Sequence, residues 1–213
     1  MRGVVFFDVD GTLVPGISSA VYLAGHLGHR DEVAAAEAAW DAGTVSPRYV
    51  EELDARGWAG TSAVQVREWL ADLPLVDGIA DVVAWCTAND VVPVLATLAW
   101  RPVGEFLCTR FGFVEACGPT LEVRDGLYTG ISLTGSDEYR KRDFARDFAK
   151  DHGLSLAQCA AVGDSLSDLP LFAEAGLAIG FNATDRARAL AHTNHTGNDL
   201  RVILPTLRAW FEC

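Results

Sequence analysis

The chain has little positive charge, few cysteines and no long apolar run. Its 213 residues include 17 Lys and Arg against 29 Asp and Glu, a net charge of −12. This balance argues against nucleic acid or an anionic membrane as the main partner, because both favour a positive surface. No apolar stretch approaches the roughly 20 residues of a membrane helix. An apolar strand pattern begins at Val4, so we expect no signal peptide.

The five cysteines are odd in number and lack C-x-x-C spacing, which indicates neither a disulfide framework nor a zinc site. They are Cys86, Cys108, Cys117, Cys159 and Cys213. Cysteines that form neither disulfides nor a zinc site are typical of proteins in the reducing cytoplasm, which is the location we expect. Half of the residues are hydrophobic, enough for one domain or for a core with an insertion.

The most informative segment covers residues 4–13. Its first four residues are apolar and suit a strand buried on both faces, as in a parallel sheet. Asp8 and Asp10 follow at the carboxyl end, the edge at which open α/β sheets bind ligands. Gly11 allows the backbone to turn and to approach a ligand closely. Asp and Gly also end strands in ordinary turns, so this segment alone leaves the function open.

The rest of the chain divides into a helical block and an alternating region. Residues 17–73 are Ala-rich in part and predict helices. From Gly78 onward the patterns predict strands over 91–96, 160–162 and 177–179, with helices over 80–86, 103–111, 141–152 and 168–175, and a hairpin over 121–129. Alternation of this kind predicts an α/β fold, a Rossmann-like parallel sheet core. We expect a core of residues 1–14 and 77–213, covered by a small helical cap of residues 15–76 inserted after the first strand.

A second acidic cluster also follows an apolar run, as the first does. Residues 160–163 form a short apolar run that ends in glycine, and Asp164 and Asp168 follow it. If the two strands are neighbours, these carboxylates converge on Asp8 and Asp10. Carboxylates gathered in this way repel one another, and oxygen ligands of this type suit Mg²⁺. The sequence therefore predicts a magnesium site at the edge of the sheet.

Three further residues fit the binding of a phosphoryl group. Thr97 ends the strand over 91–96, where its hydroxyl and the amide of Leu98 could bind a phosphoryl oxygen. Lys141 opens a predicted helix and could neutralise a nucleophile and a transferring phosphoryl group. Each is a weak signal alone, since threonine is common at strand ends and a helical lysine is usually solvated.

Together these segments resemble the four motifs of the haloacid dehalogenase superfamily. The matching residues are Asp8, Asp10, Gly11 and Thr12, then Thr97, Lys141, and the set Gly163, Asp164, Ser165 and Asp168. Residues 100–130 and 141–182 resemble the phosphoserine-phosphatase-like branch in particular. The resemblance implies a Mg²⁺-dependent phosphatase that acts on a small-molecule phosphomonoester, with a small cap of the C1 type.

The resemblance also implies a role for each residue. Asp8 would be the nucleophile that forms an aspartyl-phosphate, and Asp10 the general acid and base. Mg²⁺ would be held by Asp8, the backbone carbonyl of Asp10 and Asp164, with Asp168 orienting the site from nearby. The phosphoryl group would be bound by Thr97, Leu98 and Lys141. An acid at position 10 argues against dehalogenation, which needs no proton on its halide leaving group.

The resemblance is weaker at the positions that recognise the substrate. Phosphoserine phosphatases carry a glutamate at the position of Ile17 and an arginine at the position of Asp54, with Arg56 two residues away. A site that loses charged recognition groups discriminates poorly for a zwitterion. We therefore expect that phosphoserine is not the best substrate and that a more apolar or larger ester is favoured. Trp100 and Arg101 are further candidates for substrate contact, although a solvent-exposed role for Arg101 is equally open.

Two alternatives remain at this point. A phosphotransferase would pass the same aspartyl-phosphate to an acceptor alcohol instead of water. A non-catalytic protein that binds a phosphate ligand would need no nucleophile, and the intact Asp8, Asp10 and Asp164 argue against it. Nothing in the sequence predicts an oligomeric state.

Overall fold

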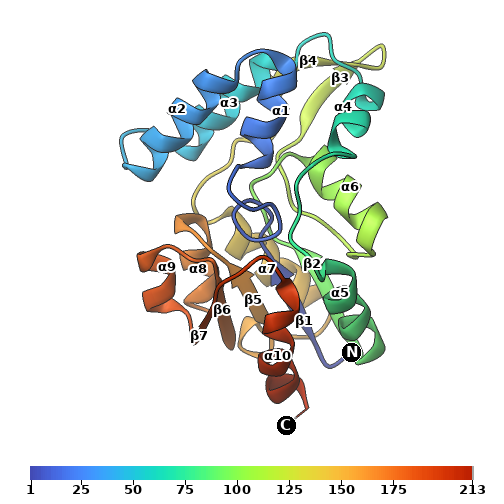
Figure 1. Cartoon of the computed structure of the whole chain (residues 1–213), viewed down its shortest axis with the longest axis vertical. Helices are drawn as coiled ribbons and strands as arrows, with labels where there is room; N and C mark the ends of the chain where they lie inside the picture. The colour runs from blue at the N-terminus through green and yellow to red at the C-terminus, as the bar shows by residue number, and fades with distance from the viewer. Residues whose placement is uncertain (213) are drawn as a thin grey trace.

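A five-stranded parallel sheet forms the centre of the computed structural model, which describes residues 1–212 (Figure 1). The strand order is β2-β1-β5-β6-β7, and all pairings are parallel. The strands are β1 (Gly3–Phe7), β2 (Val91–Leu95), β5 (Ala160–Gly163), β6 (Leu177–Phe181) and β7 (Thr193–His195). Residues 4–7 of β1 are fully buried, as expected of a central strand with both faces covered. The predicted α/β fold with a parallel core sheet is confirmed.

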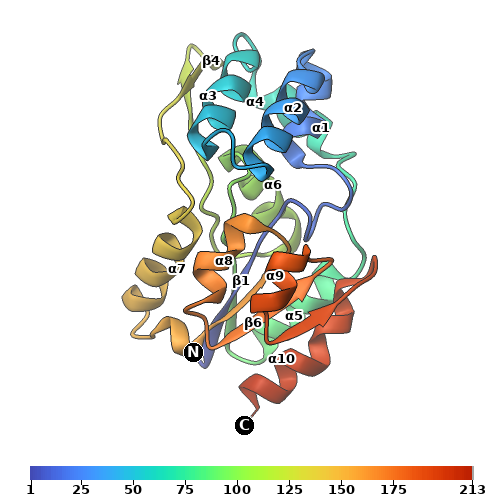
Figure 2. The ribbon, with the colours of Figure 1, turned by 90° about the vertical axis from the view of Figure 1, so that its left-hand side faces the viewer.

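Helices cover both faces of the sheet (Figure 2). Val5 and Phe7 of β1 share one apolar cluster with residues of α5 (Ile79–Ala88), α6 (Arg101–Phe111) and α10 (Leu204–Phe211). Val4 and Phe6 point to the other face, which is covered by α7 (Arg140–Asp151), α8 (Leu169–Phe172) and α9 (Asp185–Leu190). Because side chains alternate along a strand, β1 contributes to both halves of the core and is held rigidly between them.

Four helices lie beyond the carboxyl ends of the strands, in the upper part of Figure 1. They are α1 (Ser19–Leu27), α2 (Arg30–Asp41), α3 (Pro47–Gly57) and α4 (Ala63–Leu70). Serine side chains accept backbone N–H bonds at the start of α1, α3 and α4, which explains where these helices begin. The hairpin of β3 (Leu121–Arg124) and β4 (Leu127–Ser132) packs against α3 (Figure 1).

The structure differs from the predicted elements in a few places. The single helix predicted over 168–175 is a 3-10 turn, η2 (Leu166–Asp168), followed by the short α8, which begins with Pro170 in its first turn. The strand β7 was not predicted, because its three residues are polar. Further 3-10 turns are η1 (Leu156–Gln158) and η3 (Leu200–Ile203). In residues 1–212, no helix has the length and apolarity needed to cross a bilayer.

Four of the cysteines, Cys86, Cys108, Cys117 and Cys159, are free thiols. Cys213 lies outside the described residues.

Candidate active site

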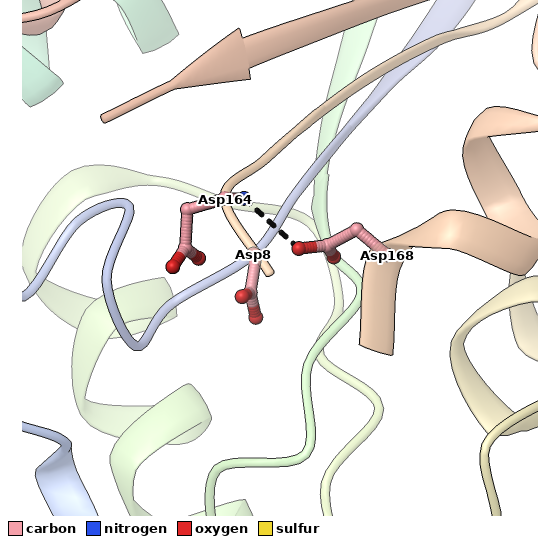
Figure 3. Close-up of side chains that lie close together, drawn as sticks. All are labelled: Asp8, Asp164 and Asp168. Atoms are coloured by element: carbon pink, nitrogen blue, oxygen red, sulfur yellow. Dashed lines mark hydrogen bonds between the residues drawn. The ribbon is translucent and has the colours of Figure 1, made fainter. Parts of the chain in front are cut away.

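The candidate site lies where three neighbouring strands end. Asp8 follows β1, Thr97 lies just after β2, and Asp164 follows β5. The turn η2 brings Asp168 to the same place, and Figure 3 shows the three carboxylates close together. One carboxylate oxygen from each of Asp8, Asp164 and Asp168 lies within 4.8 Å of the others. Strand order thus joins two acidic clusters that are more than 150 residues apart.

Lys141 is the buried cation of this group. Its side chain is 2% exposed, and its Nζ atom lies 2.8 Å from Oδ1 of Asp8 and 2.8 Å from Oδ1 of Asp168. The second oxygen of Asp168 accepts the backbone N–H of Asp164 at 3.0 Å (Figure 3) and that of Ser165 at 3.1 Å. Asp168 therefore has both oxygens engaged, and it orients Lys141 and the loop after β5 together.

The electrostatic balance of the group favours a cation. Burial raises the pKa of Asp8, which the nearby Lys141 opposes. Burial also raises the pKa of Asp164, and the charges of Asp8 and Asp168 raise it further. One ammonium does not balance three clustered carboxylates, so this oxygen-rich group fits a hard divalent ion such as Mg²⁺.

Asp10 contacts the start of α1 and is not part of the group of three carboxylates. Its Oδ1 accepts the backbone N–H of Ser19, the first residue of α1, at 2.6 Å. Burial raises the pKa of Asp10, which favours the protonated form that a proton donor needs. Gly11 has a φ of +82°, and a Cβ atom there would overlap the Asp164 carboxylate. Only glycine fits this turn.

Thr97 is fully buried beside the cavity. Its hydroxyl oxygen accepts the backbone N–H of Ala99 at 3.0 Å, so its proton is directed elsewhere. The backbone N–H of Thr97 donates to Sγ of Cys117 at 3.2 Å, which helps to fix the end of β2. Leu98 also lines the cavity.

A cavity of about 350 Å³ separates this sheet edge from α1, α2 and α3. Of the residues proposed to choose the substrate, Ile17 and Trp100 line it. Arg56 is exposed and does not line it, because it lies two residues after the cavity-facing Asp54, about 200° further round the helix. Arg101 lies instead in a separate groove between α4 and α6, 3.9 Å from Glu105. Arg56 and Arg101 therefore do not line the cavity that contains Asp8.

Several cavity residues were not predicted. Asp54 is buried, with Oδ1 2.7 Å from Nε2 of His29 and Oδ2 accepting Nε1–H of Trp100 at 2.6 Å. Glu51 accepts the backbone N–H groups of Gly135 and Ser136 and the hydroxyl of Ser132, which ties the loop after β4 to α3. Residues 37, 40 and 41 of α2 also line the cavity. Their helical spacing was visible in the sequence, but which surface they face was not.

The chain is similar to known proteins in both sequence and fold. The family described as haloacid dehalogenase-like hydrolase matches residues 5–173. A protein of Streptomyces coelicolor named phosphoserine phosphatase is 32% identical over 89% of this chain, which spans only 46% of that protein's length. A Halobacterium salinarum protein of the same name is 31% identical, with 90% of each chain covered. A solved structure titled as a phospho-aspartyl intermediate analogue of phosphoserine phosphatase superposes with a TM-score of 0.85 at 23% identity, covering 96% of this chain and 98% of that one.

Proposed function

Because the chain belongs to the haloacid dehalogenase-like hydrolase family, we propose that it is a phosphatase acting on a small phosphomonoester through an aspartyl-phosphate at Asp8. The observation that carries this proposal is the placement of Asp8. It is a buried carboxylate at the end of β1, an inner strand of the sheet, it lines the cavity, and it is held 2.8 Å from Lys141. The names of the relatives support the same class of reaction.

In the first step an oxygen of Asp8 forms a bond to phosphorus while the bond from phosphorus to the leaving alcohol breaks. Asp10 gives its proton to the leaving oxygen. In the second step the oxygen of water forms a bond to phosphorus while the bond from phosphorus to the Asp8 oxygen breaks. Asp10 takes a proton from that water, and the products are inorganic phosphate and the free Asp8 carboxylate. The hydroxyl of Thr97, the amide of Leu98 and the ammonium of Lys141 bind the phosphoryl oxygens.

The site is proposed to use Mg²⁺, which the excess of buried carboxylates fits. Asp8, Asp164 and the backbone carbonyl of Asp10 would hold the ion, since the Asp10 side chain is engaged by Ser19. When bound, Mg²⁺ neutralises negative charge on the carboxylates and on the phosphoryl group. Asp168 has no free oxygen and positions its neighbours instead.

Residues 15–76 are proposed to act as a cap over a core of residues 1–14 and 77–213. Helices α1, α2 and α3 contribute one wall of the cavity, so the cap would exclude water from the reaction. Phosphoserine is not the expected preferred substrate, because apolar Ile17 lines the cavity and Arg56 does not. The free thiols agree with a cytoplasmic location, which we also propose.

The test is turnover of an aryl phosphate by the wild type, by Asp8→Asn, and by Asp151→Asn as a control for charge removal at an exposed site. We expect Asp8→Asn to lower kcat by at least about a thousand-fold, and Asp151→Asn to behave as the wild type. Exhaustive chelation should also abolish turnover. Retained activity in Asp8→Asn would remove the nucleophile assignment. Product analysis with added glycerol separates hydrolysis from phosphoryl transfer to an alcohol.

A further inference from the structure

One face each of α2 and α3 forms the cavity wall opposite the phosphoryl-binding residues. The α2 residues that line the cavity are Glu37, Trp40 and Asp41, and those of α3 are residues 47, 50, 51 and 54. This spacing of three and four places each set on a single helix face. Because the same cavity contains Asp8 and Thr97, a bound phosphomonoester must direct its alcohol portion toward these two faces.

All the ionisable side chains of this wall are acidic. They are Glu37, Asp41, Glu51 and Asp54. Among the described residues that line the cavity, Lys141 is the single Lys or Arg, and it is already paired with Asp8 and Asp168. A carboxylate on the alcohol portion would therefore meet like charge without a compensating arginine or lysine.

The four acidic residues are not equally available to a ligand. Both oxygens of Asp54 are engaged, by His29 and by Trp100. Both oxygens of Glu51 hold the loop after β4. Asp41 is exposed at the end of α2. Glu37 is half-buried, accepts one hydrogen bond, from the Ser18 hydroxyl at 2.7 Å, and forms no ion pair within the described chain.

Glu37 is also close to the reacting groups. Ser18 donates to Glu37, and the next residue, Ser19, donates its backbone N–H to Asp10. Two adjacent residues thus hold the proposed proton donor and the Glu37 carboxylate side by side. Burial, together with the charge of Asp10, raises the pKa of Glu37 to about 7, a shift that a bound cation would oppose. Trp40 lies one turn further along the same face, and an indole ring attracts a cation.

We propose that the alcohol portion of the substrate carries a protonated amine and no carboxylate, and that Glu37 binds this amine. The substrate class is thus the phosphate ester of a small amino alcohol, in place of the more apolar or larger ester that the sequence led us to expect, because four acidic residues line the cavity wall. This inference rests on the phosphatase function proposed above. It identifies a specificity residue on α2, away from Ile17, Arg56, Trp100 and Arg101.

The first experiment compares kcat/KM of the wild type for three matched esters. These are 2-aminoethyl phosphate, 2-hydroxyethyl phosphate, which lacks the amine, and phosphoserine, which adds a carboxylate. An aryl phosphate is the activity control. We expect the aminoethyl ester to exceed each of the other two matched esters by at least about ten-fold. A preference for phosphoserine or for the hydroxyethyl ester, with the aryl phosphate hydrolysed, overturns this inference and leaves the phosphatase function standing. No hydrolysis of any ester overturns both.

The second experiment assigns the effect to Glu37. Glu37→Gln should lower the ratio of kcat/KM for the aminoethyl ester to that for the hydroxyethyl ester by about 10- to 100-fold. Glu68→Gln, at an exposed position of α4, makes the same change in charge and should leave that ratio as in the wild type. A merely structural role for Glu37 would lower kcat/KM for both esters equally. An unchanged ratio in Glu37→Gln therefore overturns the assignment.

Discussion

Replacement of Lys141 by methionine tests the electrostatic design of the site. The ammonium of Lys141 is buried between Asp8 and Asp168, 2.8 Å from an oxygen of each. Methionine fills a similar volume without charge, so the packing around α7 is preserved while both ion pairs are lost. The variant thus separates the charge of Lys141 from its bulk.

The expected loss of stability follows from the buried charges. Removing one partner of a buried ion pair costs about 3–5 kcal/mol, because the other partner stays buried without compensation. In the variant, Asp168 still accepts hydrogen bonds from the backbone N–H groups of Asp164 and Ser165, which limits its contribution to the loss of stability. Burial already raises the pKa of Asp8, and loss of Lys141 raises it further. Asp8 can therefore bind a proton in the variant, which lowers the free-energy penalty of its unpaired buried charge. We expect a loss of about 3 kcal/mol near pH 8.

The sign of the pH dependence is fixed by the same argument. Burial raises the pKa of Asp8 in the folded wild type, and loss of Lys141 raises it further, so the stabilities of the two proteins diverge as pH rises from the first of these pKa values to the second. The Lys141→Met loss should therefore shrink toward pH 5.5 and grow toward pH 8. It should also be accompanied by a fall of about 10²–10³ in kcat on an aryl phosphate.

Urea denaturation in the presence of a chelator, followed by tryptophan fluorescence, measures this loss. Lys150→Met removes an exposed lysine from the same helix and should cost less than about 0.5 kcal/mol. Adding Asp168→Asn to Lys141→Met should restore at least about 1 kcal/mol, because one uncompensated charge is removed. A Lys141→Met cost below about 1 kcal/mol near pH 8, or one that is independent of pH, would refute the reasoning.

Three further predictions follow from single contacts. Asp10→Asn should still form the phosphoenzyme from an aryl phosphate, whose leaving group needs no proton, but should hydrolyse it about 10²–10⁴ times more slowly, as measured by rapid quench. Gly11→Ala should lose activity, since its Cβ would overlap the Asp164 carboxylate, whereas Gly43→Ala, also at positive φ but in open space, should retain activity. The hydrogen bond to Asp54 raises the pKa of His29 above 6.5, so this pair stabilises the fold fully below that pH and less as pH rises through the folded value. The urea midpoint of His29→Gln should not fall as pH rises through this range. A fall as large as that of the wild type would contradict the stabilising role of the pair.

The sheet and its edge could be predicted because the signal is local. Apolar runs before Asp8 and Asp164 mark central strands, and parallel strands bring their carboxyl ends to one edge. A short polar strand such as β7 has no such signal. The split of the expected helix over 168–175 reflects Pro170, which cannot donate a backbone N–H and begins α8.

The cavity wall could not be predicted, because it depends on how helices pack. The spacing of Glu37, Trp40 and Asp41 indicates a common face, but only the fold turns that face toward Asp8. Asp54 and Trp100 are 46 residues apart and meet through a hydrogen bond that no local pattern indicates. Helix geometry also decides that Asp54 faces the cavity while Arg56 faces solvent.

The central claim is that Asp8 carries the phosphoryl group during turnover. The most direct measurement is to quench the enzyme during hydrolysis of a phosphomonoester, reduce it with borohydride and examine the N-terminal peptide by mass spectrometry. An acyl phosphate at Asp8 is reduced to homoserine at that position, and this is the result we predict. Turnover at the normal rate without modification of Asp8, or with modification of another carboxylate, would contradict the account.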